Sequence, residues 1–344
     1  MKVAAINCSY KGMRPGDTIY NLGAEKIANY HRALGDEVYC GPWAPLDLQN
    51  VDRFYFSVIF TWDIPDLIRV VSMARSWGKE VEVGGPAATF MHTYIHTQTG
   101  VEPHQGLDPR FERVPGEYEL TFTSRGCPHR CPFCGVKKVE PVAIEYDDFP
   151  LASRIGDNNL TATSWTHQEL VVNKMVNFAG EIDINSGFDV RFFTEDHLHL
   201  YSPLRLESAT RGRHWRFAFD TMEVEDDVRR VAAMMRGAGM DRHHVTFYCL
   251  IGFPGQTPDE CHYRLRTIID LGMNPYPMRF TPLNSLRRNY VAPGWSEELL
   301  QHMTAYYQTP YLWMSDTWEN FRPGKKIVET PPEQAALAEE GCYV

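Results

Sequence analysis

The sequence predicts an α/β protein in which a small unit with a parallel sheet precedes a longer series of alternating strands and helices. Two observations predict this class. Over residues 1–100, short apolar runs alternate with segments whose apolar residues recur at helical spacing. A second alternation of the same kind begins at residue 118 and continues to residue 281.

The N-terminal unit is predicted to be Rossmann-like. Its strand candidates are residues 2–7, 37–40, 54–60 and 81–83. Two stretches between them carry an apolar face at helical spacing, the second behind a possible N-cap at Asp63. The faces consist of Ile27, Tyr30, His31 and Leu34, and of Leu67, Val70, Val71 and Ala74. Residues 91–116 show no clear period, so we expect a connector.

Six further strands are predicted beyond the connector. They are residues 118–123, 154–160, 181–185, 215–220, 244–251 and 275–281. Helical stripes lie between them, and TPDE at 257–260 predicts a helix start with a capping box between Thr257 and Glu260. Six strands are too few for an eight-fold barrel. The residues alone leave an open six-strand barrel and a doubly wound sheet as alternatives.

The C-terminal part is predicted to be a helix over residues 296–308, an aromatic stretch over 311–321, and a charged, proline-bearing tail from 322 that is poorly ordered. The predicted domains are therefore residues 1–116, 117–293 and 294–344.

The composition is that of a soluble protein. Of its 344 residues, 43% are hydrophobic and 23% charged, and no apolar run approaches the roughly 20 residues that cross a bilayer. The first apolar run is too short for a signal peptide, so we expect a cytoplasmic protein without a membrane partner. The net charge of −10 argues against a general polyanion binder. Basic stretches with aromatics at 211–216 and 286–289 keep nucleic acid as a possible partner.

The stretch RGCPHRCPFCG (125–135) contains three of the eight cysteines: Cys127, Cys131 and Cys134. A structural zinc site needs four ligands, and no second pair follows at a suitable distance. A redox C-x-x-C motif would leave Cys127 without a role. A cubane cluster normally takes one thiolate per iron, so three cysteines would leave one iron open to a small molecule. This arrangement favours catalysis.

The C-x3-C-x2-C spacing, with the aromatic Phe133 before the last cysteine, resembles the radical S-adenosylmethionine (radical SAM) superfamily. The resemblance implies a partial (β/α)6 TIM-like radical SAM barrel, preceded by the small Rossmann-like domain. It also implies that the three cysteines hold a [4Fe–4S] cluster whose open iron binds S-adenosylmethionine. Reductive cleavage then yields a 5′-deoxyadenosyl radical that takes a hydrogen atom from the substrate. A one-electron donor such as flavodoxin or ferredoxin is implied, and Phe133 would line the adenine side.

The glycine turn in YCLIGFPGQTPDE (248–260) joins a predicted strand to a capped helix. It is similar to the G-x-P-G-x-T turn of the MiaB-like, elongator-like and cobalamin-domain branches, where the strand end lies against the adenine. By this resemblance Gly252, Phe253, Pro254 and Gly255 bind the cofactor. An ordinary tight turn is the alternative.

Asp157, Asn158 and Asn159 end a predicted strand. They stand where the superfamily often has Gly-Gly-Glu, which holds the amino group of the methionine moiety. The resemblance assigns them that role, and the alternative is a polar turn.

Asp189 and Arg191 lie two residues apart in SGFDVRFF (186–193), which we also interpret as a strand, so they are expected to face the same side. A zwitterionic, ribose-bearing ligand would partner both charges, and an internal ion pair is the alternative. Asp220 ends another strand, where α/β sheets bind ligands, unless it caps the next helix.

The combination of GDNNL, GFDVRF, RFAFD and GFPGQT resembles a group of uncharacterised, partly phage-associated radical SAM proteins with a short Rossmann-like leader. The resemblance covers most of residues 1–290.

Cobalamin is a possible but not favoured cofactor. VGGPAATF (83–90) resembles a turn of cobalamin-domain radical SAM proteins. The D-x-H-x-x-G signature would fall at residues 7–12, where Asn7 and Ser9 replace the aspartate and the histidine ligand. The leader is also short for a full cobalamin domain. The prediction is therefore a degenerate domain without cobalamin.

The function predicted is a radical SAM enzyme that acts on a small molecule or peptide. A nucleic-acid-modifying or cobalamin-dependent, methyl-transferring radical SAM enzyme is the first alternative. A non-catalytic, zinc-stabilised interaction protein is the second.

Overall fold

The structure is a computed structural model that describes residues 1–9, 19–44, 48–178, 180–208 and 212–321. The tail predicted from residue 322, part of the cobalamin signature and Arg211 lie outside these residues. The chain divides into two compact units. Unit 1 comprises residues 1–127, 134–152 and 282–288, and unit 2 comprises 128–133, 153–281 and the residues from 289 onward. The predicted division after residues 116 and 293 stays a prediction.

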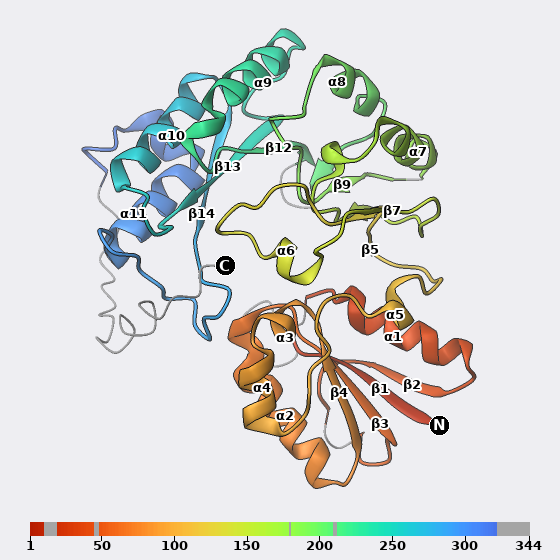
Figure 1. The fold of residues 1–344 in the computed structure, drawn as a ribbon. Helices are drawn as coiled ribbons and strands as arrows, with labels where there is room; N and C mark the ends of the chain where they lie inside the picture. Colours follow the sequence, from red (N-terminus) through yellow and green to blue (C-terminus); the bar gives the residue numbers. More distant parts are fainter. Residues whose placement is uncertain (10–18, 45–47, 179, 209–211, 322–344) are drawn as a thin grey trace. The chain divides into compact units, whose positions relative to one another are not determined.

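Unit 1 is built on a four-stranded parallel sheet with the order β2-β1-β3-β4 (Figure 1). The strands are β1 (Lys2–Asn7), β2 (Glu37–Gly41), β3 (Arg53–Ser57) and β4 (Glu80–Gly84). All four predicted strands are confirmed to within a few residues. Placing β1 inside the sheet brings the carboxyl ends of β1 and β3 side by side, with Asn7 opposite Ser57.

Helices cover both faces of this sheet. Helix α1 (Leu22–Ala33) packs on one face and α2 (Ile64–Ser76) on the other, followed by α3 (Pro86–Phe90) and α4 (His92–Thr99). Side chains alternate between the two faces along the buried strands, as the period of two requires. Those facing α1 are Val3, Ala5 and Tyr55, and those facing α2 are Ala4, Ile6, Phe54 and Phe56.

Three local predictions in unit 1 need correction. Leu34 is 63% exposed because α1 ends before it and it serves as the C-cap. Asp63 occupies the N-cap position of α2, as predicted, but its side chain makes no capping bond, since the 3₁₀ turn η1 (Thr61–Asp63) leads directly into α2. The connector contains α4 and α5 (Pro109–Glu112). Helix α4 buries only Ile95 and Thr99, so its sequence carries almost no apolar period.

The remainder of unit 1 surrounds the cysteine loop. Strand β5 (Leu120–Thr121) is much shorter than the predicted strand over 118–123. Strands β6 (Ser124–Arg125) and β7 (Ile144–Glu145) pair antiparallel, and α6 (Val136–Val139) lies between them in sequence.

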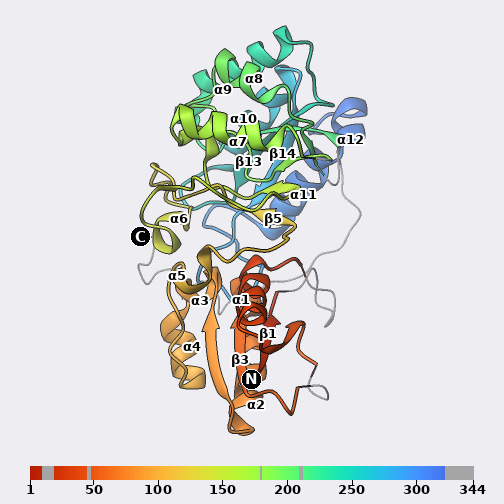
Figure 2. The same ribbon diagram turned by 90° about the vertical axis from the view of Figure 1, so that its right-hand side faces the viewer.

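Unit 2 contains a three-stranded parallel sheet with the order β12-β13-β14. The strands are β12 (Trp215–Ala218), β13 (Val245–Ile251) and β14 (Asn274–Arg279), and each lies where a strand was predicted. After the short turn η3 (Met222–Val224), helix α9 (Glu225–Gly237) crosses from β12 to β13, and α10 (Pro258–Asp270) crosses from β13 to β14. Helix α11 (Glu297–Gln308) packs against β14 and precedes α12 (Pro310–Ser315), as Figure 2 shows.

The first part of unit 2 has shorter strands than predicted. Strands β8 (Arg154–Ile155) and β9 (Asp183–Ile184) pair in parallel, with η2 (Leu160–Ala162) and α7 (Trp165–Met175) between them. Helix α8 (Glu195–Tyr201) and the antiparallel pair β10 (Glu207–Ser208) and β11 (Gly212–Arg213) follow. The Phe188 amide donates to the Arg216 carbonyl at 2.8 Å, which links the segment after β9 to β12. The fold is α/β with parallel strands, as predicted.

The start of α10 confirms half of the predicted capping box. The Thr257 hydroxyl accepts a hydrogen bond from the Glu260 amide at 3.2 Å, and Pro258 occupies the first helical turn. The Glu260 carboxylate instead lies 3.6 Å from the Arg264 Nε. Among the described residues, no helix is both long and apolar enough to cross a bilayer.

Gly85 lies in the turn after β4, where its backbone passes close to that of Val58. A substitution at Gly85 tests how much this close approach matters. The φ of Gly85 is +105°, and an added Cβ would contact the Val58 carbonyl oxygen and lie 2.9 Å from the Val58 nitrogen. We expect Gly85→Ala to lower the free energy of unfolding by about 2–3 kcal/mol, because strain and a backbone clash combine. The measurement is urea denaturation.

Gly35→Ala is the matched control. Gly35 also has a positive φ, of +81°, but an added Cβ meets nothing within 4 Å. This variant should lose only about 1 kcal/mol, from backbone strain alone. Equal losses of unfolding free energy in the two variants would show that the clash with Val58 adds nothing to the cost of Gly85→Ala.

Candidate functional site

Buried charges hold the first residues of the cysteine loop. The Arg125 Nε lies 2.7 Å from Glu112 Oε1, and its Nη1 lies 3.1 Å from Glu140 Oε1. The Gly126 amide donates to the other Glu140 oxygen at 2.9 Å. Gly126 has a φ of +78°, and a Cβ there would lie 2.9 Å from the Ala143 Cα. Only glycine fits this entry to the loop without strain.

Glu112 is the centre of this charge network in unit 1. The Lys26 Nζ donates to the Glu112 carbonyl oxygen at 2.5 Å and lies 3.4 Å from its carboxylate, and the Tyr146 hydroxyl donates to Oε1 at 3.0 Å. Burial raises the pKa of Glu112, but Arg125 and then Lys26 bring it below its ordinary value. Burial lowers the pKa of Lys26 and, with the Glu112 charge, raises that of Tyr146 to about 12.

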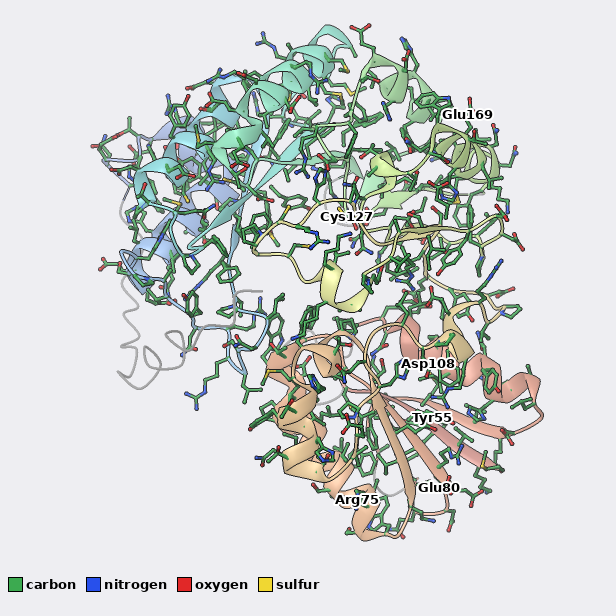
Figure 3. The ribbon with its side chains drawn as sticks, viewed as in Figure 1. Tyr55, Arg75, Glu80, Asp108, Cys127 and Glu169 are labelled. Atoms are coloured by element: carbon green, nitrogen blue, oxygen red, sulfur yellow. The ribbon has the colours of Figure 1, made fainter. Side chains whose placement is uncertain are left out.

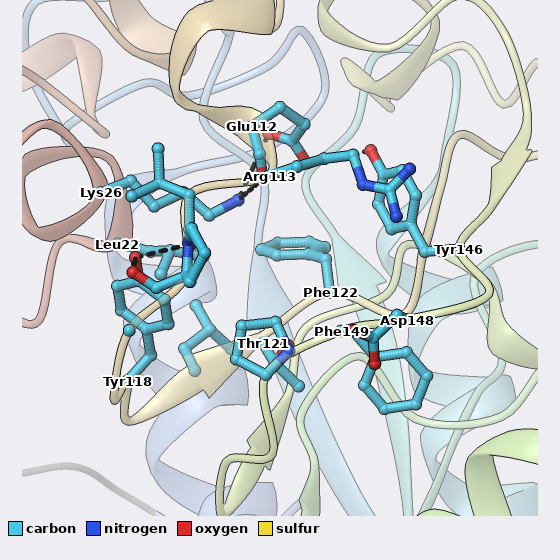
Figure 4. A pocket seen from close by; sticks show the side chains of 15 residues that line it. Leu22, Lys26, Glu112, Arg113, Tyr118, Thr121, Phe122, Tyr146, Asp148 and Phe149 are labelled. Carbon is cyan, nitrogen blue, oxygen red and sulfur yellow. Dashed lines mark hydrogen bonds and ion pairs between the residues drawn. The ribbon is translucent and has the colours of Figure 1, made fainter. Parts of the chain in front are cut away.

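Lys26, Glu112 and Tyr146 also line a cavity of about 280 Å³ in unit 1 (Figure 4). Tyr118, Phe122 and Phe149 contribute aromatic surface to it. The Arg125 guanidinium lies 3.5 Å from the centre of the Phe122 ring, a cation–π contact that helps to bury its charge. Sequence reasoning missed this network, because Glu112 lies in the connector that showed no period. Arg125, directly before the first cysteine, was the available signal.

The three cysteines are accessible thiols. Cys127, labelled in Figure 3, and Cys131 are partly exposed, and Cys134 is exposed. The loop exit is closely packed, because a Cβ on Gly135 would contact the Phe90 ring and lie 2.9 Å from a Leu283 methyl group. The unit boundary passes through this loop, with residues 128–133 assigned to unit 2.

Within unit 2, the structure brings three predicted site residues together with the middle of this loop. The Asp189 carboxylate accepts hydrogen bonds from the Asn159 amide at 2.7 Å and from Nε and Nη2 of Arg191, each at 2.7 Å. The His129 Nε2 lies 3.1 Å from the same carboxylate. The network therefore joins the segment after β8, the segment after β9 and the cysteine loop.

The predicted strand over residues 186–193 is wrong. This segment is a turn, and the Arg191 amide donates to Asp189 Oδ1 at 3.1 Å. Asp189 and Arg191 meet because the chain curls at the aspartate rather than because they share a strand face. The Asp189 side chain is only 8% exposed, whereas that of Arg191 is 36% exposed. The internal ion pair, given as the alternative, is present.

Charge partners set the protonation of this pair. Burial raises the pKa of Asp189, but Arg191 and Asn159 bring it below its ordinary value. Burial lowers the pKa of Arg191, but the hydrogen bonds and the charge of Asp189 bring it above its ordinary value. Each charge of this pair therefore stabilises the other.

The predicted trio Asp157, Asn158 and Asn159 forms a turn directly after β8. Asp157 is 2% exposed, and its charge contributes, after burial, to a raised pKa of Tyr201. Asn159 accepts a hydrogen bond from the Thr161 hydroxyl at 3.1 Å while its amide donates to Asp189. Asn158 is partly exposed. Of the three, Asn159 joins the network around Asp189.

Asp220 links the ends of β12 and β13. The Leu250 amide donates to its carboxylate at 2.8 Å, and the Gln256 side chain donates to its carbonyl at 2.9 Å. Burial raises the pKa of Asp220, partly offset by the Leu250 amide and by Arg264. The turn that follows begins at Thr221 without a side-chain cap. The alternative role of Asp220 as a helix cap is therefore wrong.

The glycine turn after β13 contacts the aromatic residue of the cysteine loop. Phe253 meets Phe133 edge-on at 5.7 Å between ring centres, and meets Phe280 in the same way at 4.9 Å. Gly252 has a φ of +76°, and a Cβ there would lie 2.8 Å from a Leu300 methyl group. The close approach that favours glycine at position 252 is therefore to the Leu300 side chain. Gly255 has a φ of +88° with open space beside it, and Pro254 lies between these positions.

The donor chemistry of the loop fits an iron–sulfur cluster. Thiolates are the ligands that such clusters prefer, and three cysteines lie on this one loop. Across the described ranges, no three His, Cys, Asp or Glu side chains form a preassembled metal site. The assignment of an iron–sulfur cluster to this loop therefore depends on the spacing of its three cysteines.

The edge of the N-terminal sheet has no imidazole at the predicted ligand position. The Asn7 side chain donates to the Ile19 carbonyl at 2.7 Å, and the Ser9 hydroxyl accepts from the Ile59 amide at 2.8 Å. Both residues thus stabilise loops after β1 and β3.

One arginine of each predicted basic stretch has a partner within the protein. Arg288 lies 4.8 Å from the centre of the Trp62 ring, which stacks on Phe60 at 4.5 Å. Arg216 is buried and pairs with Asp183 at 2.6 Å. These contacts favour a structural role for Arg216 and Arg288.

No family model matches the sequence, and no curated protein does. Solved structures do match. They include a radical S-adenosylmethionine methyltransferase, TsrM from Kitasatospora setae, with cobalamin and a [4Fe–4S] cluster bound (12% identity, TM-score 0.58, 82% of this chain and 77% of that one). The chain therefore shares the fold of this structure. A second TsrM structure, with tryptophan substrate and a SAM analogue bound, gives 12% identity, a TM-score of 0.57, and coverage of 82% and 75%.

The charge network at the loop entry predicts a pH-dependent stability. The pKa of Glu112 is lowered in the folded state. Its contribution is therefore present above the unfolded pKa of about 4.3 and is lost as the pH falls through the folded value. We expect Glu112→Gln to lower the free energy of unfolding by about 3 kcal/mol at pH 7, because Arg125 and Lys26 lose a buried partner. The difference from the parent protein should shrink steadily below pH 4.

Glu117→Gln is the control, because Glu117 is exposed and directly follows the connector that contains Glu112. It should change the stability by less than about 0.5 kcal/mol at any pH. Denaturant titrations from pH 3 to pH 8 test both variants. A Glu112→Gln difference that does not depend on pH would contradict the charge network.

Proposed function

We propose that this chain is a radical SAM enzyme whose Cys127, Cys131 and Cys134 hold a [4Fe–4S] cluster with one iron open to S-adenosylmethionine. The observation that carries the proposal is the C-x3-C-x2-C loop in a chain with a radical SAM fold. When bound, the cluster supplies the electron that cleaves S-adenosylmethionine, and the resulting radical abstracts hydrogen from a small molecule or peptide.

The protein's own contribution is positioning. Arg125 and Glu140 fix the backbone where the loop begins, and Asp189 holds the loop through His129. Phe133 and Phe253 present an apolar, edge-to-face surface suited to the adenine ring. Such a surface excludes water from the reacting atoms.

The remaining candidate contacts are polar. Asn158 and Asn159 offer amide groups to the methionine end of S-adenosylmethionine, with Asp157 beside them. Asp220 and the turn from Gly252 to Gly255 are assigned to the nucleoside end. Asp189 and Arg191 already pair with one another. They therefore contact a ligand only through the atoms that this pair leaves exposed, chiefly those of Arg191.

The proposed setting is the cytoplasm, with flavodoxin or ferredoxin as the electron donor. The exposed Cys134 and the partly exposed Cys127 and Cys131 allow such a donor to approach.

Cobalamin-dependent methyl transfer is the second candidate. It is favoured by one observation: the likeness to a cobalamin-bound methyltransferase spans 82% of the chain. Against it, Asn7 and Ser9 occupy the positions of the ligand signature and are engaged in hydrogen bonds of the fold. Reconstitution with hydroxocobalamin, followed by gel filtration, separates the candidates. Loss of the pigment from the protein fraction favours the first proposal, and stoichiometric retention favours the second.

The cluster assignment predicts the behaviour of cysteine variants. Each of Cys127→Ala, Cys131→Ala and Cys134→Ala should abolish formation of 5′-deoxyadenosine from S-adenosylmethionine with dithionite under anaerobic conditions. Each should also lose most of its iron and acid-labile sulfide, because the cluster needs three thiolates from this loop.

Cys40→Ala is the matched control, since Cys40 is a partly exposed thiol in the N-terminal sheet. It should keep the parent iron content and product yield. About one zinc per chain without sulfide in the parent protein would instead support a zinc-stabilised interaction protein. Full activity in any of the three loop variants would also refute the proposal.

A further inference from the structure

We propose that the cavity in unit 1 binds a small aromatic carboxylate. This inference goes beyond the proposed function, because the site uses neither the cysteines nor S-adenosylmethionine. All residues that line the cavity belong to unit 1. They come from α1, from residues 112–122 and from residues 146–150.

The cavity has room for one ring with a substituent. Its volume is about 280 Å³, just below the usual range for sites that bind drug-sized molecules. It is well above the volume of roughly 150 Å³ that holds benzene in an engineered protein cavity. A molecule of the size of benzoate therefore fits.

Aromatic rings form the apolar wall of the cavity. Tyr118, Tyr146 and Phe149 line it and are buried. The Tyr118 hydroxyl donates to the Val114 carbonyl at 2.9 Å. The Tyr146 hydroxyl donates to Glu112 at 3.0 Å. Because both hydroxyls have partners within the protein, these residues present their rings to a ligand, and such a surface favours a planar aromatic body.

The acidic side chains at the cavity are already engaged. One Glu112 oxygen accepts hydrogen bonds from Arg125 at 2.7 Å and from Tyr146 at 3.0 Å. The other accepts from Arg125 at 3.1 Å and lies 3.4 Å from the Lys26 ammonium. These contacts use the about four acceptor positions of a carboxylate. Asp148 is exposed to solvent and has a partner of its own, so neither carboxylate favours a cationic ligand.

Two cationic side chains keep donors that a ligand can use. The Lys26 ammonium has three donors, and both of its contacts go to Glu112. The Arg113 side chain makes no hydrogen bond or ion pair within the described part of the chain, and its guanidinium lies 5.6 Å from the centre of the Tyr146 ring. Donors of this kind beside aromatic rings match an aromatic anion.

The positions of these groups give the ligand an orientation. Arg113 is exposed, so it lies where the cavity meets solvent, whereas Tyr118 and Phe149 are buried (Figure 4). A guanidinium binds a carboxylate through two parallel hydrogen bonds. We therefore expect the carboxylate at Arg113 and the ring against the buried aromatic residues. This orientation keeps the ligand's charge partly hydrated and so avoids the full cost of burying it.

The cavity also adjoins the residues that hold the entry to the cysteine loop. Glu112 pairs with Arg125 at 2.7 Å, and the Arg125 guanidinium lies 3.5 Å from the centre of the Phe122 ring. Glu112 and Phe122 both line the cavity. A ligand in the cavity therefore restrains two side chains that position Arg125, and we expect it to slow amide exchange over residues 112–126.

Calorimetric titration of the full chain with benzoate tests the site. We expect one benzoate per chain with a Kd of about 1 mM or lower. Benzyl alcohol, which is similar in size but uncharged, and benzylamine, which carries the opposite charge, should bind at least several-fold more weakly. Hydrogen exchange with benzoate present should slow in peptides covering residues 112–126 and 146–150 and stay unchanged over α2.

Arg113→Gln tests the anion-binding group. The variant should weaken benzoate binding at least several-fold and leave the affinity for benzyl alcohol unchanged, because it removes the partner of the charge and keeps the aromatic wall. It should fold, since Arg113 is exposed and holds no ion pair among the described residues. Arg69→Gln is the matched control. It removes the same charge from α2, on the other face of the sheet, and should leave benzoate binding unchanged.

The outcomes separate this inference from the proposed function. Failure to detect saturable benzoate binding, or equal affinity for benzoate and benzylamine, overturns the inference. Undiminished benzoate binding by Arg113→Gln, or slowed exchange only outside the cavity peptides, also overturns it. The titration needs no cluster. Selective benzoate binding by a protein that forms no iron–sulfur cluster would therefore leave this inference standing while the proposed function fails.

Discussion

The candidate site depends on the double role of Glu140 at the start of the cysteine loop. One oxygen of this carboxylate pairs with Arg125, and the other accepts the amide of Gly126, one residue before Cys127. Both side chains are less than 10% exposed, and charges that deep are tolerated only when each has a partner. Arg125 needs two carboxylates, and Glu112 in turn needs Lys26 and Tyr146. The backbone that leads to the first thiol is thereby fixed by a closed set of charges.

The middle of the loop also lies beside a buried charge that needs partners, in this case the carboxylate of Asp189. Asp189 gathers Asn159, Arg191 and His129, but Arg191 remains partly exposed. The network at the loop entry buries both Arg125 and Glu140, whereas the network around Asp189 leaves its guanidinium partly open to solvent.

Much of the fold could be predicted from the sequence because its strands are apolar and buried. The four strands of unit 1 and the three strands β12, β13 and β14 each carry a strong local signal. Strands β8 and β9 are only two residues long, and their ends are determined by long-range hydrogen bonds rather than by local pattern. Helix α4 was missed because its sequence is polar on nearly every side.

The site was predictable in its residue types but not in its contacts. The cysteine spacing and the polar residues at positions 157–159, 189 and 191 could be recognised in the sequence. That Asp189 would hold the loop through His129 could not, since no local pattern relates two residues sixty positions apart. Glu112 and Glu140 were missed for the same reason, as carboxylates whose partner is distant in the sequence.

The central claim is that the three cysteines leave one cluster iron open to S-adenosylmethionine. Electron paramagnetic resonance of the reduced protein, recorded before and after addition of S-adenosylmethionine, tests it most directly. We predict a [4Fe–4S] signal whose g-values shift when S-adenosylmethionine is added, because the ligand binds an iron that no side chain occupies. A cluster signal that stays unchanged at saturating S-adenosylmethionine, or no cluster signal at all, would contradict the account.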